Sequence, residues 1–317
     1  MAGLVGFVKN WWHYAIGFAI LVYLLSRLDV SAIASAFSSA NAVLVVVAFL
    51  LIVPMFIIKA VRWQYIMGRQ GIRYGLGDSI SMYFAAMYIG FVTPGRVAEL
   101  LKASYLVRDG HSFGKSFFSV FLDRLVDLLF LMIIGYFGLF FFKNLFSTQI
   151  VWLGLLGVAG AVAAFVLLVK KELAKSLLKS LLKRVVPASR KASVEAYVED
   201  FYASMGLFNL KSSAVILLLT ALSFVFYFLV AVLLARSLGI NVNYVFIIFS
   251  MSIAALIAIL PVSIAGVGTR DATLLLLLGS LGVAKETIIA YSTFNLLATL
   301  FLIGLCSQFW FRKPIRF

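Results

Sequence analysis

Two short breaks interrupt an otherwise apolar chain, and each places a cation and a carboxylate beside turn-forming residues. The first break, at 91–99, contains Pro94, Gly95, Arg96 and Glu99. Proline lacks a backbone donor and glycine accepts turns that other residues resist, so a helix can restart after this pair. The start of such a helix offers free N–H groups and a positive dipole end, and Arg96 adds a full charge. We therefore expect an anion site of the kind that binds phosphates, with Glu99 pairing Arg96 or an incoming cation.

The second break repeats these parts and contains Pro261, Gly266, Gly268, Arg270 and Asp271. A membrane protein tolerates irregular backbone and charge only where protein or a watery cavity surrounds them. Paired Gly/Pro-broken segments in the two halves of a chain indicate a transport site. The alternative is that each arginine–carboxylate pair is a buried brace that touches no substrate.

A third group of charges opens the apolar stretch 116–142. Asp123 and Asp127 are spaced to share one helix face, and Arg124 stands beside them. We expect Arg124 to neutralise Glu99 or Asp123, or to supply a third cation to a phosphate-bearing substrate. The alternative is that these three charges satisfy one another and fix helix packing.

Other cations have a more ordinary interpretation. Lys59 and Arg62 stand at the end of the apolar stretch 41–61, where basic residues commonly anchor a helix at the membrane surface, and Arg62 is retained as a coupling or bracing residue. Lys102 is expected either to line an entry path for a lipid headgroup or to extend toward the membrane surface.

The composition is that of an integral membrane protein. The chain has 317 residues, of which 64% are hydrophobic and 12% charged, against about 25% charged residues in a soluble domain. Its formal charge of +15 is concentrated in a few loops, so we expect it to set topology and contact anionic lipid rather than nucleic acid. With one cysteine, Cys306, no internal disulfide can form. We find no P-loop, dinucleotide fingerprint, metalloprotease motif or nucleophile elbow, and we expect no enzyme activity, no cofactor and no metal site.

The apolar stretches predict an all-α polytopic membrane protein that forms one transmembrane domain over 1–317. About six stretches are long enough to span a bilayer, and we expect the first to be retained as a helix rather than cleaved as a signal peptide. These stretches are 11–26, 41–61, 116–142, 150–169, 212–235 and 286–310.

Two further stretches, 76–109 and 244–283, are long but broken in the middle. If each returns to its own side, and both termini are cytoplasmic, all three basic clusters of the chain lie in the cytoplasm. The sequence therefore predicts two re-entrant hairpins in inverted arrangement, within a multi-pass protein of the cell membrane. The segment 170–191 alternates apolar and lysine-rich faces, and is expected to be a cytoplasmic amphipathic helix bound to anionic lipid or a solvated basic helix.

Four motifs in this order resemble the lysylphosphatidylglycerol synthase transmembrane, or flippase-like, family (UPF0104) over 55–310. They are Lys59-x-x-Arg62-Trp63, Phe91-x-x-Pro-Gly-Arg-x-x-Glu99, Leu122-Asp-Arg-x-x-Asp127 and Leu260-Pro-x-x-x-x-Gly-x-Gly-x-Arg-Asp271. The family's second break commonly ends in Arg-Glu, whereas here Asp271 keeps the charge on a shorter side chain. The resemblance covers only the family's membrane domain, since we find no cytosolic acyltransferase domain in these residues and do not expect synthase activity.

The resemblance implies a membrane domain that moves or presents anionic lipids, such as an aminoacylated phospholipid or a polyprenyl-phosphate-linked sugar. We therefore expect a flippase or scramblase whose substrate is held by Arg96, Glu99, Arg124, Arg270 and Asp271. The alternatives are a secondary transporter of a small anion and a non-transporting membrane subunit of a lipid or glycan synthesis pathway. Further partners would be membrane lipids, a second copy of the chain, or an enzyme of that pathway.

Overall fold

The computed structural model describes residues 30–92, 99–142, 144–145, 149, 152, 154–160, 191–259 and 266–312, and within them the regular structure is entirely helical. The predicted all-α fold is therefore confirmed. The expected span 11–26, most of the span 150–169 and all but the last residue of the segment 170–191 lie outside the described residues. The labelled helices are α2 (Val30–Ser38), α3 (Ala42–Arg69), α4 (Leu76–Val92), α5 (Lys102–Arg108), α6 (Phe113–Phe141), α9 (Lys191–Met205), α10 (Leu210–Ser237), α11 (Tyr244–Ile259), α12 (Thr269–Gly279) and α13 (Lys285–Arg312).

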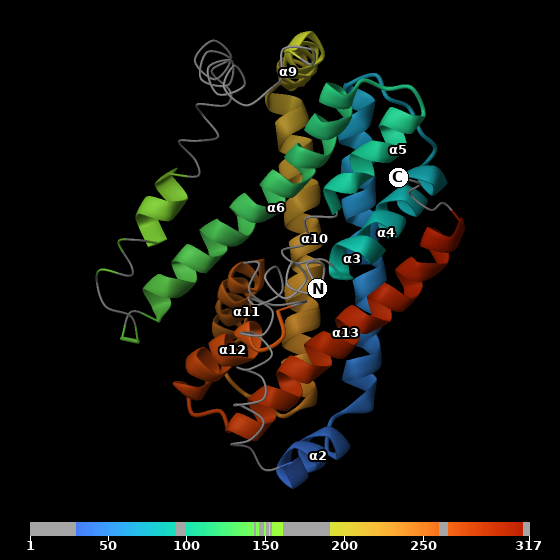
Figure 1. Ribbon diagram of the computed structural model, residues 1–317. Helices are drawn as coiled ribbons and strands as arrows, with labels where there is room; N and C mark the ends of the chain where they lie inside the picture. The colour runs from blue at the N-terminus through green and yellow to red at the C-terminus, as the bar shows by residue number, and fades with distance from the viewer. Residues whose placement is uncertain are drawn as a thin grey trace, which may run out of the picture.

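Helices α3 and α10 form an antiparallel pair that runs the length of the bundle (Figure 1). At one end the backbone N–H of Asn41 donates to the carbonyl of Ser237 at 2.8 Å. At the other end the Arg69 guanidinium donates to the carbonyl of Leu207 at 2.9 Å. We call the Arg69 end the upper end and the Asn41 end the lower end, as they lie in Figure 1. Among the described residues, three helical stretches are long and apolar enough to cross a membrane: Ala42–Arg69, Leu210–Ser237 and Lys285–Phe309.

The α4–α5 segment leaves the upper end and returns to it. The loop before α4 contacts the loop after α5, because the hydroxyl of Tyr74 donates to Asp109 at 2.8 Å. The ring of Tyr74 also meets that of His111, with 6.1 Å between the ring centroids. Burial and the hydrogen bond to Asp109 raise the pKa of Tyr74 above its ordinary value. The two short helices therefore form a hairpin whose open side faces the upper end.

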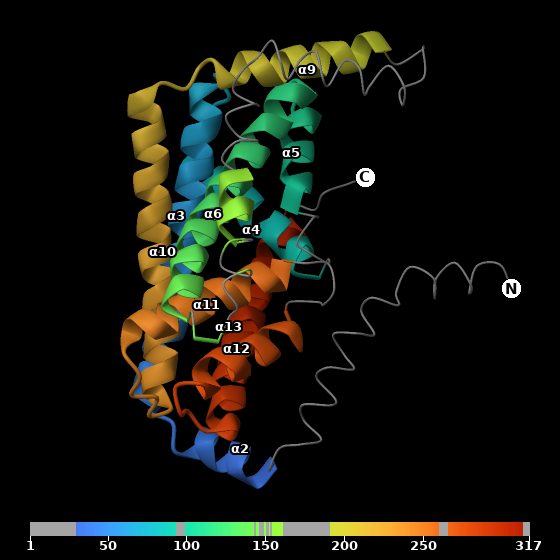
Figure 2. The same ribbon diagram turned by 90° about the vertical axis from the view of Figure 1, so that its left-hand side faces the viewer.

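The α11–α12 segment makes the corresponding hairpin at the lower end. Helices α11 and α12 pack against each other, and the loops outside them, 238–242 and 281–284, line one open pocket of about 500 Å³. Figure 2 shows this pair low in the bundle, while α5 lies high, close to α9. The two hairpins therefore enter the bundle from opposite ends.

The two halves of the described bundle repeat one plan. Helices α3 to α6 have 28, 17, 7 and 29 residues, and α10 to α13 have 28, 16, 11 and 28. Each half is thus a long helix, two short helices that form a hairpin, and a second long helix. Because α3 and α10 run in opposite directions, the second half is inverted relative to the first.

The predicted helix limits agree with the structure except at one end of α3. The stretches 212–235 and 286–310 correspond to α10 and α13, which end within two residues of those limits. The prediction that Lys59 and Arg62 lie at the membrane-surface end of a span was wrong. Helix α3 continues to Arg69. Arg62 is completely buried, and its partners lie on α6 and α10.

Helix α9 lies across the upper end of the bundle (Figure 2). It packs closely on the start of α6, where Gly114 leaves room for the carbonyl of Tyr197. A Cβ at position 114 would lie 2.2 Å from that oxygen. The hydroxyl of Ser112, which precedes α6, also donates to the Asp200 carboxylate. These contacts fix the upper end of α6, the helix that carries the charges described next.

Candidate functional site

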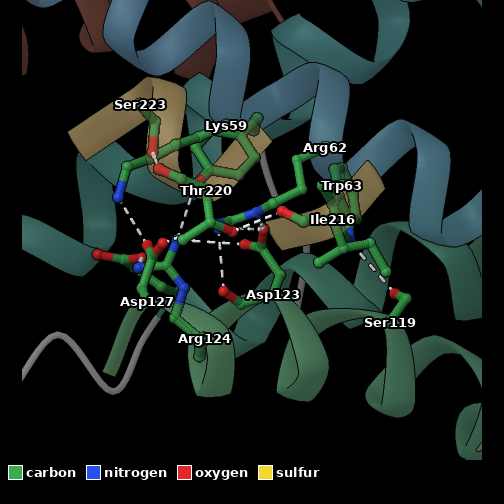
Figure 3. Close-up of polar contacts among 12 residues, drawn as sticks. Lys59, Arg62, Trp63, Ser119, Asp123, Arg124, Asp127, Ile216, Thr220 and Ser223 are labelled. Carbon is green, nitrogen blue, oxygen red and sulfur yellow. Dashed lines mark hydrogen bonds and ion pairs between the residues drawn. The ribbon is translucent and has the colours of Figure 1, made fainter. Parts of the chain in front are cut away.

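Seven charged side chains meet between α3, α6 and the α4–α5 hairpin (Figure 3 shows five of them). Most are fully buried, and at 1.5 Å per residue Arg62 lies about 10 Å from the upper end of α3. We call this group the buried charge cluster; its members are Lys59, Arg62, Glu99, Lys102, Asp123, Arg124 and Asp127.

Arg62 joins α3 to both aspartates of α6. Its Nε and Nη2 donate to Oδ1 of Asp123 at 3.0 and 2.7 Å, and its Nη1 donates to Oδ1 of Asp127 at 2.6 Å. The two aspartates are one helical turn apart, so a single planar guanidinium reaches both. The third helix at this point is α10, where Thr220 accepts a hydrogen bond from Nη1 at 2.8 Å.

Two lysines complete the coordination of the aspartates. Lys59 donates to Oδ2 of Asp127 at 2.6 Å, and Lys102 donates to Oδ2 of Asp123 at 2.7 Å. The Lys102 ammonium also lies 4.1 Å from the ring centroid of Tyr83 and 5.1 Å from that of Trp63. Lys102 is fully buried, so the expectation that it extends toward the membrane surface was wrong. In both aspartates each carboxylate oxygen accepts from a cation.

Arg124 differs from the rest of the cluster because it is the most exposed member, with 25% of its side chain accessible. It forms an ion pair with the buried carboxylate of Glu99. Its Nη2 also donates to the hydroxyl of Tyr83 at 2.7 Å and lies 3.3 Å from Oδ2 of Asp123. Both carboxylates that the sequence suggested as partners of Arg124 therefore contact it.

Glu99 lies at the first turn of the returning arm of the hairpin and packs directly on the backbone of α4. A Cβ at Gly90 would lie 2.1 Å from Cγ of Glu99, so no larger residue fits there without moving the glutamate. The Glu99 side chain is 0% exposed. Its Oε2 forms an ion pair with Arg124, and among the described residues neither of its two buried oxygens has a hydrogen-bond partner.

The cluster holds four cations and three carboxylates. With all groups ionised, it has one positive charge more than its own carboxylates neutralise. An uncompensated charge in an apolar interior is costly, so the cluster favours an additional anion. Its most accessible cation, Arg124, is the natural contact for one. Within the described residues no group of His, Cys, Asp and Glu side chains could hold a metal ion.

A second, smaller polar group stands in the other half of the bundle. Arg270 donates from Nε and Nη2 to the hydroxyl and carbonyl of Ser292 on α13, both at 3.0 Å. Asp271 caps the start of α12 by accepting from the N–H of Gly268 at 2.7 Å, and its other oxygen accepts from Ser292. Gly266 and Gly268 have positive φ angles of 77° and 82°, which allow the tight turn before α12.

The inverted halves place these two groups at corresponding positions. Lys102 begins α5 and reaches Asp123 on α6, 21 residues later; Arg270 is near the start of α12 and reaches Ser292 on α13, 22 residues later. Among the described residues, the polar group of the second half contains no pair of aspartates on its last long helix that would correspond to Asp123 and Asp127. The first half is therefore the more highly charged one.

The structure brings together only part of the expected substrate site. Of the expected substrate-binding residues, Glu99 and Arg124 belong to the cluster, whereas Arg270 and Asp271 contact Ser292 on α13. The expected coupling or bracing residues Arg62, Asp123 and Asp127 also belong to the cluster. Pro94, Gly95, Arg96 and Pro261 lie outside the described residues. Thr220 and Tyr83 were not predicted to belong to the site. In the sequence each is only a polar residue within an apolar helix.

This fold and site define a multi-pass helical membrane protein with charged side chains buried among its apolar helices. The chain belongs to the family of the lysylphosphatidylglycerol synthase TM region, whose sequence model matches residues 10–306. It is also similar to a UPF0104 membrane protein of Methanocaldococcus jannaschii, with 23% identity over 275 residues that cover 82% of each chain. The expected family is therefore confirmed.

Proposed function

We propose that this protein translocates an anionic, phosphate-bearing lipid between the two leaflets of the cell membrane. The observation that carries the proposal is the surplus positive charge of the buried charge cluster, with its accessible cation at Arg124. The family's name refers to the synthase of a phosphate-bearing lipid, which is consistent with a lipid ligand. A phosphate group suits a guanidinium because it accepts two parallel hydrogen bonds.

The two hairpins would provide the path of the lipid headgroup across the membrane. We propose that both are re-entrant, that both termini are cytoplasmic, and that the upper end faces the cytoplasm. The α4–α5 hairpin then enters from the cytoplasmic side and the α11–α12 hairpin from outside. In such an inverted arrangement a modest rocking of one half against the other exposes a central site to each side in turn.

The headgroup phosphate would bind Arg124 while the lipid tails stay in the bilayer. Arg62, Lys59 and Lys102 would neutralise Asp123 and Asp127, so that the carboxylates of α6 do not repel the phosphate. On the other side Arg270 is the corresponding cation, and Arg96 is proposed as a further contact. Glu99, Asp123 and Asp271 are the buried carboxylates that could couple transport to an ion.

Leaflet exchange in proteoliposomes tests the proposal directly. Fluorescent phosphatidylglycerol and phosphatidylcholine would be compared, with a soluble phosphate flux measured in the same vesicles. We expect faster exchange of the anionic lipid than in protein-free vesicles and no soluble flux. Soluble flux without lipid exchange would favour a small-anion transporter, and neither activity would favour a membrane subunit of a synthesis pathway.

A further inference from the structure

The buried carboxylates of the two polar groups differ in how completely their oxygens are paired. In Asp123, Asp127 and Asp271 both oxygens accept hydrogen bonds. In Glu99 neither oxygen accepts a hydrogen bond from the described residues, and the one cation that they place against it is Arg124, which forms an ion pair with Oε2. Buried polar atoms are rarely left unpaired, and those that are often mark a functional position.

Glu99 is also paired with the most exposed cation of the buried charge cluster. Its partner Arg124 is 25% exposed, whereas Arg62 and Lys102, which hold Asp123, are 0% exposed. An anion that binds Arg124 therefore competes mainly with Glu99, because Asp123 keeps Arg62 and Lys102 as partners. The Arg124 guanidinium can move toward a bound anion because its contact with Asp123 is long, at 3.3 Å.

We infer that Glu99 is the proton-binding group of the transport cycle: the lipid phosphate displaces it from Arg124, and it takes up a proton in exchange. This inference rests on the proposed function. A carboxylate that stays buried after losing its cation would be an uncompensated charge, and a proton removes that charge. The Oε1 atom can carry the proton, since it accepts no hydrogen bond from the described residues.

The surroundings of Glu99 offer no replacement for Arg124 among the described residues. The backbone of Gly90 on α4 covers one side of the glutamate. The nearest ammonium belongs to Lys102, which is held by Asp123 and the ring of Tyr83. Among the described residues, the titratable and charged groups that interact with Glu99 are Lys102 on α5, Arg124 on α6 and Cys306 on α13. Tyr83 on α4 and Asp123 on α6 contact Arg124.

Proton uptake on lipid binding tests this without any transport assay. Dihexanoyl phosphatidylglycerol, a phosphodiester that does not itself titrate near neutral pH, would be added to weakly buffered protein in detergent with an indicator dye. We expect wild type to take up ~1 proton per lipid bound. Glu99→Gln should bind the lipid without taking up a proton. Glu195→Gln, an exposed carboxylate of α9, is the matched control and should behave as wild type.

The outcomes separate this inference from the proposed function. Binding without uptake in wild type, or equal uptake in Glu99→Gln, would overturn the role of Glu99 and leave translocation standing. Absence of binding in wild type would contradict the proposed function itself. Uptake with deacylated glycerophosphoglycerol as well would overturn the assignment to a lipid. If Glu99→Gln does not fold, infrared difference spectra of wild type decide: a new protonated-carboxyl band on lipid addition supports the inference, and no band contradicts it.

Discussion

Arg62 grips Asp123 with two guanidinium nitrogens, at 3.0 and 2.7 Å, and both side chains are fully buried. Both nitrogens donate to the same oxygen, Oδ1 of Asp123, and the pair links α3 to α6. The same guanidinium holds Asp127 and Thr220, so three helices meet at one side chain. Arg62 therefore holds the centre of the buried charge cluster, and Arg124 is the most exposed of its described members.

Removing Arg62 should destabilise the protein more than removing any exposed cation. Arg62→Ala leaves Asp127 buried with Lys59, and Asp123 buried with Lys102 and the longer contact to Arg124. Breaking such a buried pair typically costs about 3–5 kcal/mol. The thermal unfolding midpoint in detergent, measured by size-exclusion chromatography after heating, should fall clearly. Arg73→Ala, an exposed cation in the loop after α3, should leave it unchanged; equal midpoints in the two variants would contradict the bracing role.

Gly90→Ala should displace Glu99. The added Cβ would lie 2.1 Å from Cγ of the glutamate, and overpacking of this kind typically costs about 1–3 kcal/mol. Leaflet exchange should fall along with the unfolding midpoint. Gly77→Ala in the same helix is the control, because nothing lies within 4 Å of its new methyl group. A Gly90→Ala protein that matched Gly77→Ala in both measurements would show that Glu99 does not need this contact.

Ser292→Ala should loosen the second hairpin. Both Arg270 and Asp271 lose a hydrogen-bond partner while remaining buried, and each unsatisfied group costs about 1–3 kcal/mol. We expect a lower unfolding midpoint, together with faster hydrogen exchange in the first turn of α12. Ser307→Ala on the same helix removes only a bond to the carbonyl of Gly304 in its own helix and should have little effect. Unchanged exchange at α12 in Ser292→Ala would argue against this anchor.

Cysteine labelling tests the inverted hairpins. In a Cys306→Ala background, Arg73→Cys and Arg108→Cys flank the α4–α5 hairpin, while Asn241→Cys and Ala284→Cys flank the α11–α12 hairpin; all four positions are exposed. With an impermeant maleimide on oriented vesicles, the first two should react from the cytoplasmic side and the last two from outside. If the members of either pair reacted from opposite sides, that segment would be a full span.

The apolar pattern and the Gly/Pro breaks were enough to predict the helices, because both are local features of the sequence. The limits of α10 and α13 and the turn glycines Gly266 and Gly268 follow from them. The roles of Lys59 and Arg62 did not follow. A cation at the end of an apolar stretch resembles a residue that anchors the helix at the membrane surface. Lys59 is 68 residues from its partner Asp127, and Arg62 is 61 residues from its partner Asp123. Only the packing of α3 on α6 brings those charges together.

The pairing of Arg124 with Glu99 was foreseen as one of several partners, because both charges stand too deep in apolar stretches to remain unpaired. The separation of Arg270 from that pair was not foreseen. The two breaks contain the same residue types, which favoured one shared site. The inverted fold instead gives each half its own polar group, with Lys102 and Arg270 in corresponding places.

The most direct test of the central claim is leaflet exchange of fluorescent phosphatidylglycerol by wild type, Arg124→Gln and Arg73→Gln in matched proteoliposomes. Arg124→Gln should lose most of the anionic exchange, by tenfold or more for the loss of a charge-assisted contact of about 1.5–3 kcal/mol, while remaining folded. Arg73→Gln should exchange lipid like wild type. Equal exchange by all three proteins would contradict a phosphate site at the buried charge cluster.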